Sequence, residues 1–199
     1  GATIVDTRHP ADFAAAHVPG TLNIPLGRSF STWAGSLLPY DRPYYLVVDD
    51  EDGAALAARG ARALALIGLD AAGGYFGAEA LAEWKTEGRA DERVTSIGAA
   101  DLLDRLANGT VTLVDVRSAS EWSAGHLPGA RWLPLGSLAD HLGDLPGDRP
   151  VVVQCQGGSR SAIAASVLLA AGRRDVLNFG GGFAEWQRAG FPIDRNPVS

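Results

Sequence analysis

The residues best suited to chemistry form the segment Cys155-Gln156-Gly157-Gly158-Ser159-Arg160, which follows the apolar run 151–154. Backbone N–H groups in a tight glycine-containing loop can form an anion-binding nest, and the N-terminus of a following helix adds partial positive charge. Both effects favour the thiolate, the form in which a cysteine attacks an electrophile. Arg160 adds a planar fork that can bind an oxyanion. The segment therefore predicts a thiolate nucleophile that acts on an anionic substrate.

We assign two roles within and beside this segment. Cys155 and Arg160 are the expected catalytic residues. The expected substrate-binding residues share the loop or follow it directly, and they are Gln156, Gly157, Gly158, Ser159 and Ser161.

Two other interpretations of this segment stay open. A lone cysteine after a buried strand can be a small core residue, although the glycines, serine and arginine that follow it favour reactivity. A cysteine phosphatase or arsenate reductase cradle is the second alternative. A phosphatase cradle has five residues between cysteine and arginine, whereas four residues separate Cys155 from Arg160. The shorter loop suits the smaller outer sulfur of a persulfide or thiosulfate.

The chain is an internal repeat. Residues 4–8 (IVDTR) recur as 113–117 (LVDVR), and residues 17–20 (HVPG) recur as 126–129 (HLPG). The offset is constant, because 115 − 6 and 126 − 17 both give 109. A shared register across separate blocks indicates two similar domains in tandem.

Strand-like and helical segments alternate in the second repeat. This alternation is typical of an α/β fold with a mostly parallel central sheet and helices on both faces, and we expect it in each domain. Because 94 − 109 is negative, residues 94–97 and 99–107 have no counterpart in the first repeat. We therefore expect a first domain truncated at its N-terminus and a chain excised from a longer protein. The expected strands are 94–97, 110–115, 130–133, 151–154 and 176–179, with helices at 99–107, 120–124, 138–142, 161–171 and around 185–186.

The expected boundaries follow from composition. Residues 1–88 form the first domain, the polar stretch 89–93 is the linker, and residues 94–199 form the second domain with its active loop at 155–160.

The first repeat lacks the nucleophile. By sequence alignment, Val48 stands opposite Gln154 and Asp49 opposite Cys155, and the loop carries four carboxylates within residues 49–52. These charges would repel an anionic donor, so we expect an inactive domain. A solvated acidic loop is favoured over a metal or acid–base site, because no histidine accompanies the carboxylates.

Three further residues occur in both repeats, with or without a cysteine. They are Asp115, Arg117 and His126. Since an inactive copy has no use for catalytic groups, we interpret them as structural residues that close a strand end and brace a turn.

Composition narrows the function classes further. A net charge of −6 disfavours a nucleic-acid partner, and the longest apolar stretch, roughly 162–171, is too short to span a bilayer. A single cysteine excludes an internal disulfide and a thiolate zinc site, so we expect no metal and no cofactor. The chain opens without a basic-then-apolar leader, which favours a cytoplasmic location.

The pattern Cys155-x-x-Gly158-x-Arg160-Ser161, preceded by Asp115-x-Arg117 and by GHLPGA at 125–130, resembles the rhodanese (thiosulfate sulfurtransferase) family. The resemblance covers nearly the whole chain, twice. It implies a five-stranded α/β domain and a double-displacement reaction. Cys155 would take a sulfane sulfur from thiosulfate or a low-molecular-weight persulfide and pass it to cyanide or a thiol.

The first repeat resembles a more specific group of bacterial proteins. In these, a metallo-β-lactamase-fold persulfide dioxygenase is fused to C-terminal rhodanese domains. The likeness rests on FSTWAG at 30–35, DRP at 41–43, ALIGLD at 65–70 and GY at 74–75. It implies such an N-terminal domain as a partner within a longer chain. It also implies the alternative to catalysis, a docking or regulatory rhodanese module of a larger sulfide-oxidising enzyme.

Overall fold

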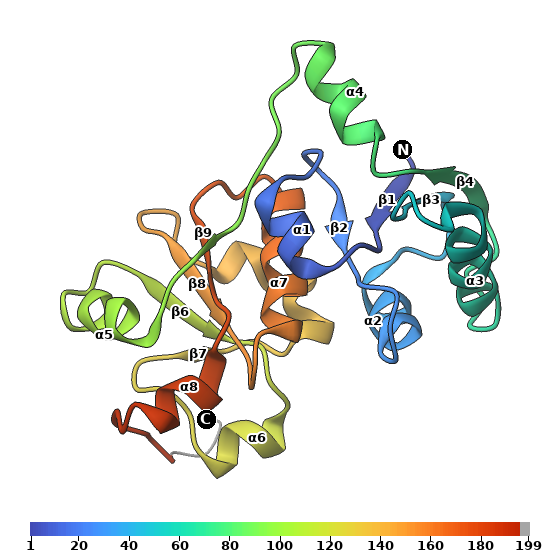
Figure 1. The fold of residues 1–199 in the computed structure, drawn as a ribbon. Coiled ribbons are helices and arrows are strands. Elements are labelled where there is room, and N and C mark those ends of the chain that lie inside the picture. Colours follow the sequence, from blue (N-terminus) through green and yellow to red (C-terminus); the bar gives the residue numbers. More distant parts are fainter. Residues whose placement is uncertain (196–199) are drawn as a thin grey trace. The chain divides into compact units, whose positions relative to one another are not determined.

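The computed structural model describes residues 1–195 and separates the chain into two compact units, Gly1–Arg93 and Val94–Ser199 (Figure 1). Each unit has one sheet whose strand pairs are all parallel. Helices connect successive strands in each unit. The predicted α/β class with parallel central sheets is confirmed.

The sheet of unit one has the order β2-β1-β3-β4. Unit one contains β1 (Thr3–Asp6), α1 (Pro10–Ala15), β2 (Leu22–Asn23), α2 (Phe30–Leu37), β3 (Tyr44–Val47), α3 (Gly53–Ala65), β4 (Ala72–Phe76) and α4 (Ala80–Thr86). Helix α3 packs on one face of this sheet, where a Cβ added to Gly60 would lie 2.8 Å from Leu46 Cδ1. Strand β4 forms an edge of the sheet and is exposed along its length.

The sheet of unit two has the order β5-β9-β8-β6-β7. Its apolar central strands β6 and β8 are buried at every position, as expected of strands covered on both faces. The elements are β5 (Thr95–Ser96), α5 (Ala99–Ala107), β6 (Thr112–Asp115), α6 (Ala119–Ala124), β7 (Arg131–Trp132), the 3₁₀ segment η1 (Leu135–Asp144), β8 (Val151–Gln154), α7 (Ser159–Ala170), β9 (Val176–Phe179) and α8 (Gly182–Arg188).

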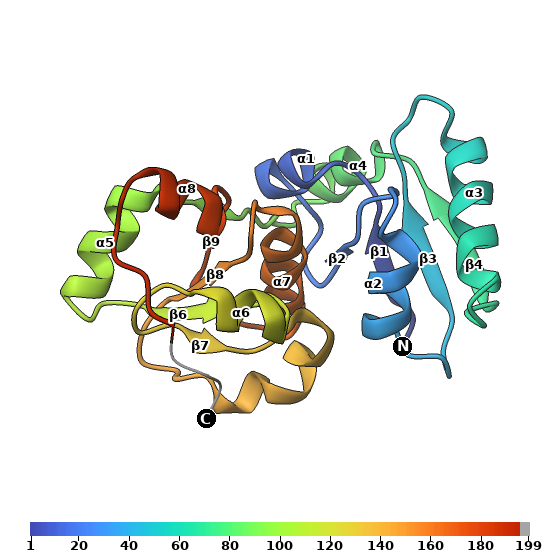
Figure 2. The ribbon, with the colours of Figure 1, turned by 90° about the horizontal axis from the view of Figure 1, so that it is seen from below.

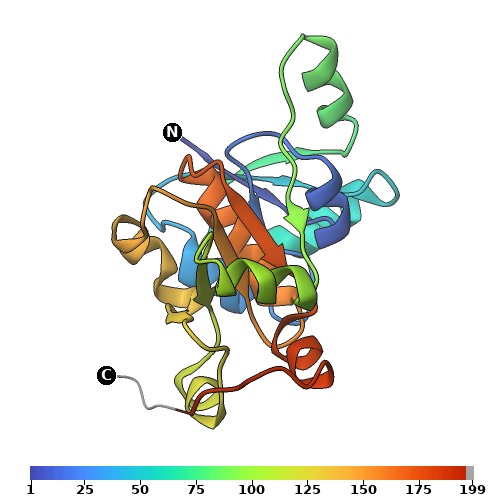
Figure 3. The same cartoon turned by 90° about the vertical axis from the view of Figure 1, so that its left-hand side faces the viewer.

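Two helical layers enclose the sheet of unit two (Figures 2 and 3). Helices α5 and α8 pack over one face, where Leu102, Leu113, Val152, Phe179 and Trp186 belong to one buried cluster. Helix α7 packs on β8 and β9 and is buried on most sides, as befits an apolar helix between layers.

The structure refines three predicted elements. The expected helix at 138–142 is a longer 3₁₀ segment with a kink at His141. The helix expected at 161–171 begins two residues earlier, at Ser159. The strand expected at 94–97 is reduced to Thr95–Ser96.

Within residues 1–195, no helix is long and apolar enough to cross a membrane. Over the same residues, no three or more His, Cys, Asp and Glu side chains gather as a metal-binding group would require.

Candidate active site

Cys155 lies between the most buried strand and the longest helix of unit two. Strand β8 ends at Gln154, and α7 begins at Ser159 after the N-cap residue Gly158. Parallel sheets place ligands at this junction of strand C-terminus and helix N-terminus. The loop is therefore shorter than the predicted 155–160, because Ser159 and Arg160 already belong to the first turn of the helix.

The sulfur of Cys155 is held by groups at the start of α7. The Gly158 N–H donates to Sγ over 3.2 Å. The thiol donates to Ser161 Oγ over 3.7 Å, and this hydroxyl donates to the carbonyl of Gly158 over 3.1 Å. An N–H donor and a helix N-terminus both stabilise negative charge on sulfur. The geometry is therefore suited to a thiolate and to a persulfide anion.

A second glycine loop, Gly180–Gly182, packs against the backbone of the cysteine loop. The N–H of Phe183 donates to the Cys155 carbonyl over 2.8 Å. Gly158 has a φ of +96°, and a Cβ there would lie 2.3 Å from the Gly180 carbonyl oxygen. A Cβ on Gly182, whose φ is +56°, would lie 2.2 Å from the Cys155 carbonyl oxygen. The two loops approach so closely that neither position accommodates a side chain without displacing backbone.

Arg160 is bound by a partner that the sequence interpretation missed. Its two terminal nitrogens donate to Glu121 Oε2 and Oε1 over 2.6 and 2.7 Å. Hydrogen bonding from Arg160 is the main cause that lowers the pKa of Glu121 to about 2. Hydrogen bonding to Glu121 in turn raises the pKa of Arg160, and the Cys155 charge contributes to the same direction. The fork expected to be free for an oxyanion is thus occupied by a carboxylate.

Glu121 is itself fixed by the start of α6. The Ser118 side chain accepts from the Glu121 N–H, and Glu121 Oε2 accepts from the Ser118 N–H over 3.1 Å. This reciprocal arrangement is a capping box. The pattern Ser-x-x-Glu at 118–121 was the available signal for Glu121 in the sequence, although it indicates a helix start rather than a site.

Asp115 and Arg117 form a buried ion pair at the end of β6. Arg117 Nη2 lies 2.6 Å from Asp115 Oδ2, and the side chains are 1% and 0% exposed. Arg117 also donates to the Gly125 carbonyl over 2.8 Å and covers the Phe183 ring at 4.2 Å. It reaches the active loop only through a 3.5 Å contact with Gln156 Oε1.

His126 lies away from the sulfur, against α6. Its Nδ1 is 3.1 Å from the Trp122 carbonyl oxygen, and its ring stacks on Trp122 with centroids 3.6 Å apart. Its backbone pairs with Asp194. These contacts join α6 to the C-terminal segment, and none of them involves Cys155.

Unit one repeats this bracing arrangement. Arg8 Nη2 lies 2.6 Å from Asp6 Oδ2, and His17 stacks on Phe13 with centroids 3.7 Å apart. Its Nδ1 lies 2.9 Å from the Phe13 carbonyl oxygen. The same geometry therefore occurs beside a loop that has no cysteine.

The sheet register corrects the alignment between the cysteine loop of unit two and the acidic loop of unit one. Asp6 pairs with Val47 and Asp115 with Gln154, so Val48, rather than Asp49, occupies the position of Cys155. The sequence alignment was wrong by one residue because the acidic loop is one residue longer before its helix N-cap, Asp52. A buried valine at the nucleophile position leaves unit one without a thiol.

The structure brings together some of the expected site residues and separates others. Gly158 and Ser161 contact the Cys155 sulfur, whereas Gln156 and Gly157 on the loop and Ser159 at the start of α7 are exposed. Cys155 is 1% exposed, so the expected nucleophile is buried and not open to solvent. The cause is its place at the end of the most buried strand, beneath residues 156–158.

The chain matches the family model described as "Rhodanese-like domain" at residues 1–86 and again at 98–189. It belongs to the rhodanese-like family, and its fold consists of two such domains in tandem. The predicted family is thereby confirmed.

Individual relatives match about half of the chain. A protein named "Sulfurtransferase" from Allochromatium vinosum is 39% identical over 101 residues, which cover 50% of this chain and 94% of the relative. "Thiosulfate sulfurtransferase GlpE" from Pseudoalteromonas translucida is 33% identical over 93 residues, covering 47% and 89%. "HTH-type transcriptional regulator Rv0324" from Mycobacterium tuberculosis is 45% identical over 101 residues, and the matched part spans only 44% of that regulator. Among solved structures, the Alr3790 protein from Anabaena is 31% identical with a TM-score of 0.48, covering 51% of this chain and 94% of that one.

Proposed function

We propose that this protein is a sulfurtransferase that carries a sulfane sulfur on Cys155. The observation that carries the proposal is the sulfur of the only cysteine, held by the Gly158 N–H at the N-terminus of α7. Membership of the rhodanese-like family and the names of two relatives, both sulfurtransferases, support the same reaction class.

The proposed reaction has two displacements. In the first, the Cys155 thiolate attacks the outer sulfur of thiosulfate, an S–S bond forms on Cys155, and sulfite leaves with the electron pair of the broken bond. In the second, cyanide or a thiolate attacks the terminal sulfur of the persulfide, and the Cys155 thiolate leaves. A low-molecular-weight persulfide can serve as donor in the same way, with its thiolate as leaving group.

Each group around the sulfur has a role in this scheme. The Gly158 N–H and the helix N-terminus stabilise the thiolate before the first step and after the second. Ser161 accepts from the thiol and keeps Sγ in place. Arg160 supplies the positive charge that offsets an anionic donor, and it must turn part of its fork away from Glu121 to do so. Gln156 and Gly157 on the loop and Ser159 at the start of α7 form the exposed side where the donor arrives.

A thiol of this kind works only while it is reduced, which supports our proposal of a cytoplasmic location. We also propose that the natural partner of unit one is a metallo-β-lactamase-fold domain of the same longer protein. That proposal rests on the sequence likeness at 30–35 and 65–70.

The test is the intact mass of the protein after incubation with thiosulfate. We expect a gain of one sulfur atom that cyanide removes, and no gain in Cys155→Ser. If neither thiosulfate nor glutathione persulfide adds sulfur to the wild-type protein, the proposal is wrong. Turnover of an aryl phosphate would instead support the phosphatase alternative, against the four-residue spacing of the loop.

A non-catalytic docking module is the second candidate, and two observations favour it. Cys155 is almost completely buried, and the Arg160 fork is bound to Glu121. A docking module keeps partner binding in both Cys155→Ser and Arg160→Ala, whereas a sulfurtransferase loses sulfur transfer in the first and much of it in the second.

A further inference from the structure

Arg160, the cation expected to receive an anionic donor, is held by Glu121 from α6. The pair is bidentate, with Arg160 Nη1 and Nη2 2.6 and 2.7 Å from the two carboxylate oxygens. Pairs of this kind are stronger than single hydrogen bonds, and they fix the plane of the guanidinium group. A donor that needs Arg160 must therefore compete with a carboxylate that is already bound.

Glu121 is held in position by its own helix. Ser118, the N-cap of α6, donates from its N–H and its hydroxyl to Glu121 Oε2 over 3.1 and 2.8 Å. The side chains of Arg160 and Glu121 are 20% and 30% exposed, so water competes only in part with the pair. The negative charge of Glu121 is therefore a fixed feature of the site.

A second arginine reaches the cysteine loop, and it is also neutralised. Arg117 Nη1 lies 3.5 Å from Gln156 Oε1. Its ion pair with Asp115 is buried and cannot open without leaving a charge unpaired in the core. Neither of these two arginines offers an unpaired positive charge to a donor.

The pair between Arg160 and Glu121 occurs beside the cysteine and is absent from the matching place in unit one. Glu121 matches Asp12 at the offset of 109 positions. Arg160 is the second residue of α7, and the second residue of α3 is Ala54, which cannot bind a carboxylate. The buried ion pair at the strand end, by contrast, occurs in both units. A contact found only beside the thiol indicates a role in the reaction.

Two classes of donor differ in the charge next to the reacting sulfur. Thiosulfate carries two negative charges, and the group that leaves from its outer sulfur is the sulfite dianion. Glutathione persulfide has its carboxylates at the ends of a tripeptide, remote from the sulfane sulfur, and its leaving group is a single thiolate. A fixed carboxylate beside the site repels the first donor more than the second.

We propose that Glu121 is a specificity-determining residue, which keeps Arg160 from thiosulfate and makes a low-molecular-weight persulfide the preferred donor. The inference rests on the sulfur transfer proposed above and names its substrate class. The Cys155 thiolate attacks the outer, protonated sulfur of the persulfide, and the donor S–S bond breaks. The donor thiolate leaves with the electron pair, and the proton stays on the transferred sulfur. This step leaves the pair closed, whereas thiosulfate must first open it and reacts more slowly.

The test compares the full wild-type chain with Glu121→Gln, using three donors. They are thiosulfate, glutathione persulfide and methanethiosulfonate, in which a methyl group replaces one oxygen of thiosulfate and one charge is lost. The rate of sulfur loading on Cys155 is followed by intact mass over a range of donor concentrations. Glutamine has the same shape as glutamate and can also complete a capping box, so the start of α6 should be retained.

The expected effect of Glu121→Gln depends on the charge of the donor. The loading efficiency of thiosulfate should rise about fivefold, mainly through a lower half-saturating concentration, because the Arg160 fork becomes available. The efficiency of methanethiosulfonate should rise about twofold, in proportion to its smaller charge. Loading from glutathione persulfide should stay the same.

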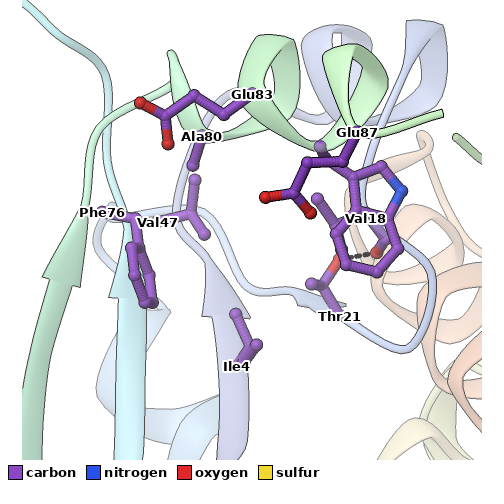
Figure 4. A pocket seen from close by; sticks show the side chains of 9 residues that line it. Ile4, Val18, Thr21, Val47, Phe76, Ala80, Glu83 and Glu87 are labelled. Carbon is purple, nitrogen blue, oxygen red and sulfur yellow. Dashed lines mark hydrogen bonds between the residues drawn. The ribbon is translucent and has the colours of Figure 1, made fainter. Parts of the chain in front are cut away.

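Two control variants separate this role from a structural one. Glu83→Gln makes the same change in unit one, where Glu83 lines an apolar pocket beside Phe76 and Ala80 (Figure 4). It should leave loading from every donor unchanged. Ser118→Ala removes the capping hydroxyl and keeps both charges of the pair. It should therefore preserve the ratio of the thiosulfate rate to the persulfide rate, even where it lowers the stability of unit two.

Four results would overturn the inference. An equal change for all donors in Glu121→Gln would leave Glu121 with a structural role alone. Slower loading from thiosulfate in this variant would show that Glu121 orients Arg160 for that donor. A wild-type protein that loads faster from thiosulfate than from glutathione persulfide would refute the preference, while sulfur transfer itself would stand. Failure of all three donors to load the wild-type protein would refute the proposed function as well.

Discussion

Gly158→Ala is the substitution that most directly tests how the cysteine loop is held. Gly158 has a φ of +96°, and left-handed backbone costs a residue with a Cβ about 1–2 kcal/mol. The added Cβ would also lie 2.3 Å from the Gly180 carbonyl oxygen, a backbone atom that must move. Overpacking of this kind costs a further 1–3 kcal/mol or so. We therefore expect unit two to lose about 2–5 kcal/mol of stability.

Gly157→Ala is the matched control, because a Cβ on Gly157 would meet nothing within 4 Å. Its effect should stay within about 0.5 kcal/mol. Amide exchange of β8 under native conditions measures the free energy of opening for unit two alone. Sulfur loading from thiosulfate is the second readout. Moving the loop displaces the Gly158 N–H from Sγ, so loading should slow at least about tenfold. Equal stability and equal loading in the two variants would refute the proposed contact between the glycine loops.

Three further predictions concern the charged residues. Arg160→Ala should lower kcat/KM for thiosulfate by about tenfold or more, because an anionic donor loses its cation; Arg149→Ala, which removes an exposed arginine paired with its neighbour, should leave kcat/KM unchanged. Asp115→Asn should destabilise unit two by about 3–5 kcal/mol, since it leaves a buried arginine uncompensated. Asp6→Asn should do the same to unit one with no effect on sulfur loading, and a loss of loading there would contradict a purely structural role. Because Arg160 depresses the pKa of Glu121 to about 2 from 4.5, the stability this pair contributes is present above about pH 4.5 and is lost as the pH falls toward 2. Glu121→Gln should remove this pH dependence of the free energy of unfolding, as measured by urea unfolding at several pH values. The change should be about 1 kcal/mol or less, because the pair is partly exposed.

The sequence predicted the fold because its repeat preserves the residues that close strands. Asp6 and Asp115, with their arginines, mark equivalent strand ends at a constant offset. The offset changes where loops differ in length, so the position of Val48 could be fixed only from strand pairing. Sequence motifs identify the ends of equivalent strands, but they do not show where a one-residue difference in loop length falls.

Contacts between distant segments account for the remaining differences at the site. Glu121 and Arg160 are separated by 39 positions, and the glycine loop that supports Cys155 begins 25 residues beyond it. Only the order of strands in the sheet brings these groups together. The burial of Cys155 has the same origin, because it depends on what β9 and α8 place around the end of β8.

A lone thiol that is 1% exposed makes the chain its own reporter of local opening. A thiol reagent reaches Cys155 when the residues that cover it move away, so the rate of labelling measures how often this local opening occurs. No engineered probe or competing thiol complicates the signal. A single change, Val48→Cys, would place a second such reporter at the matching position of unit one. The rates of local opening of the two domains could then be compared in the same molecule.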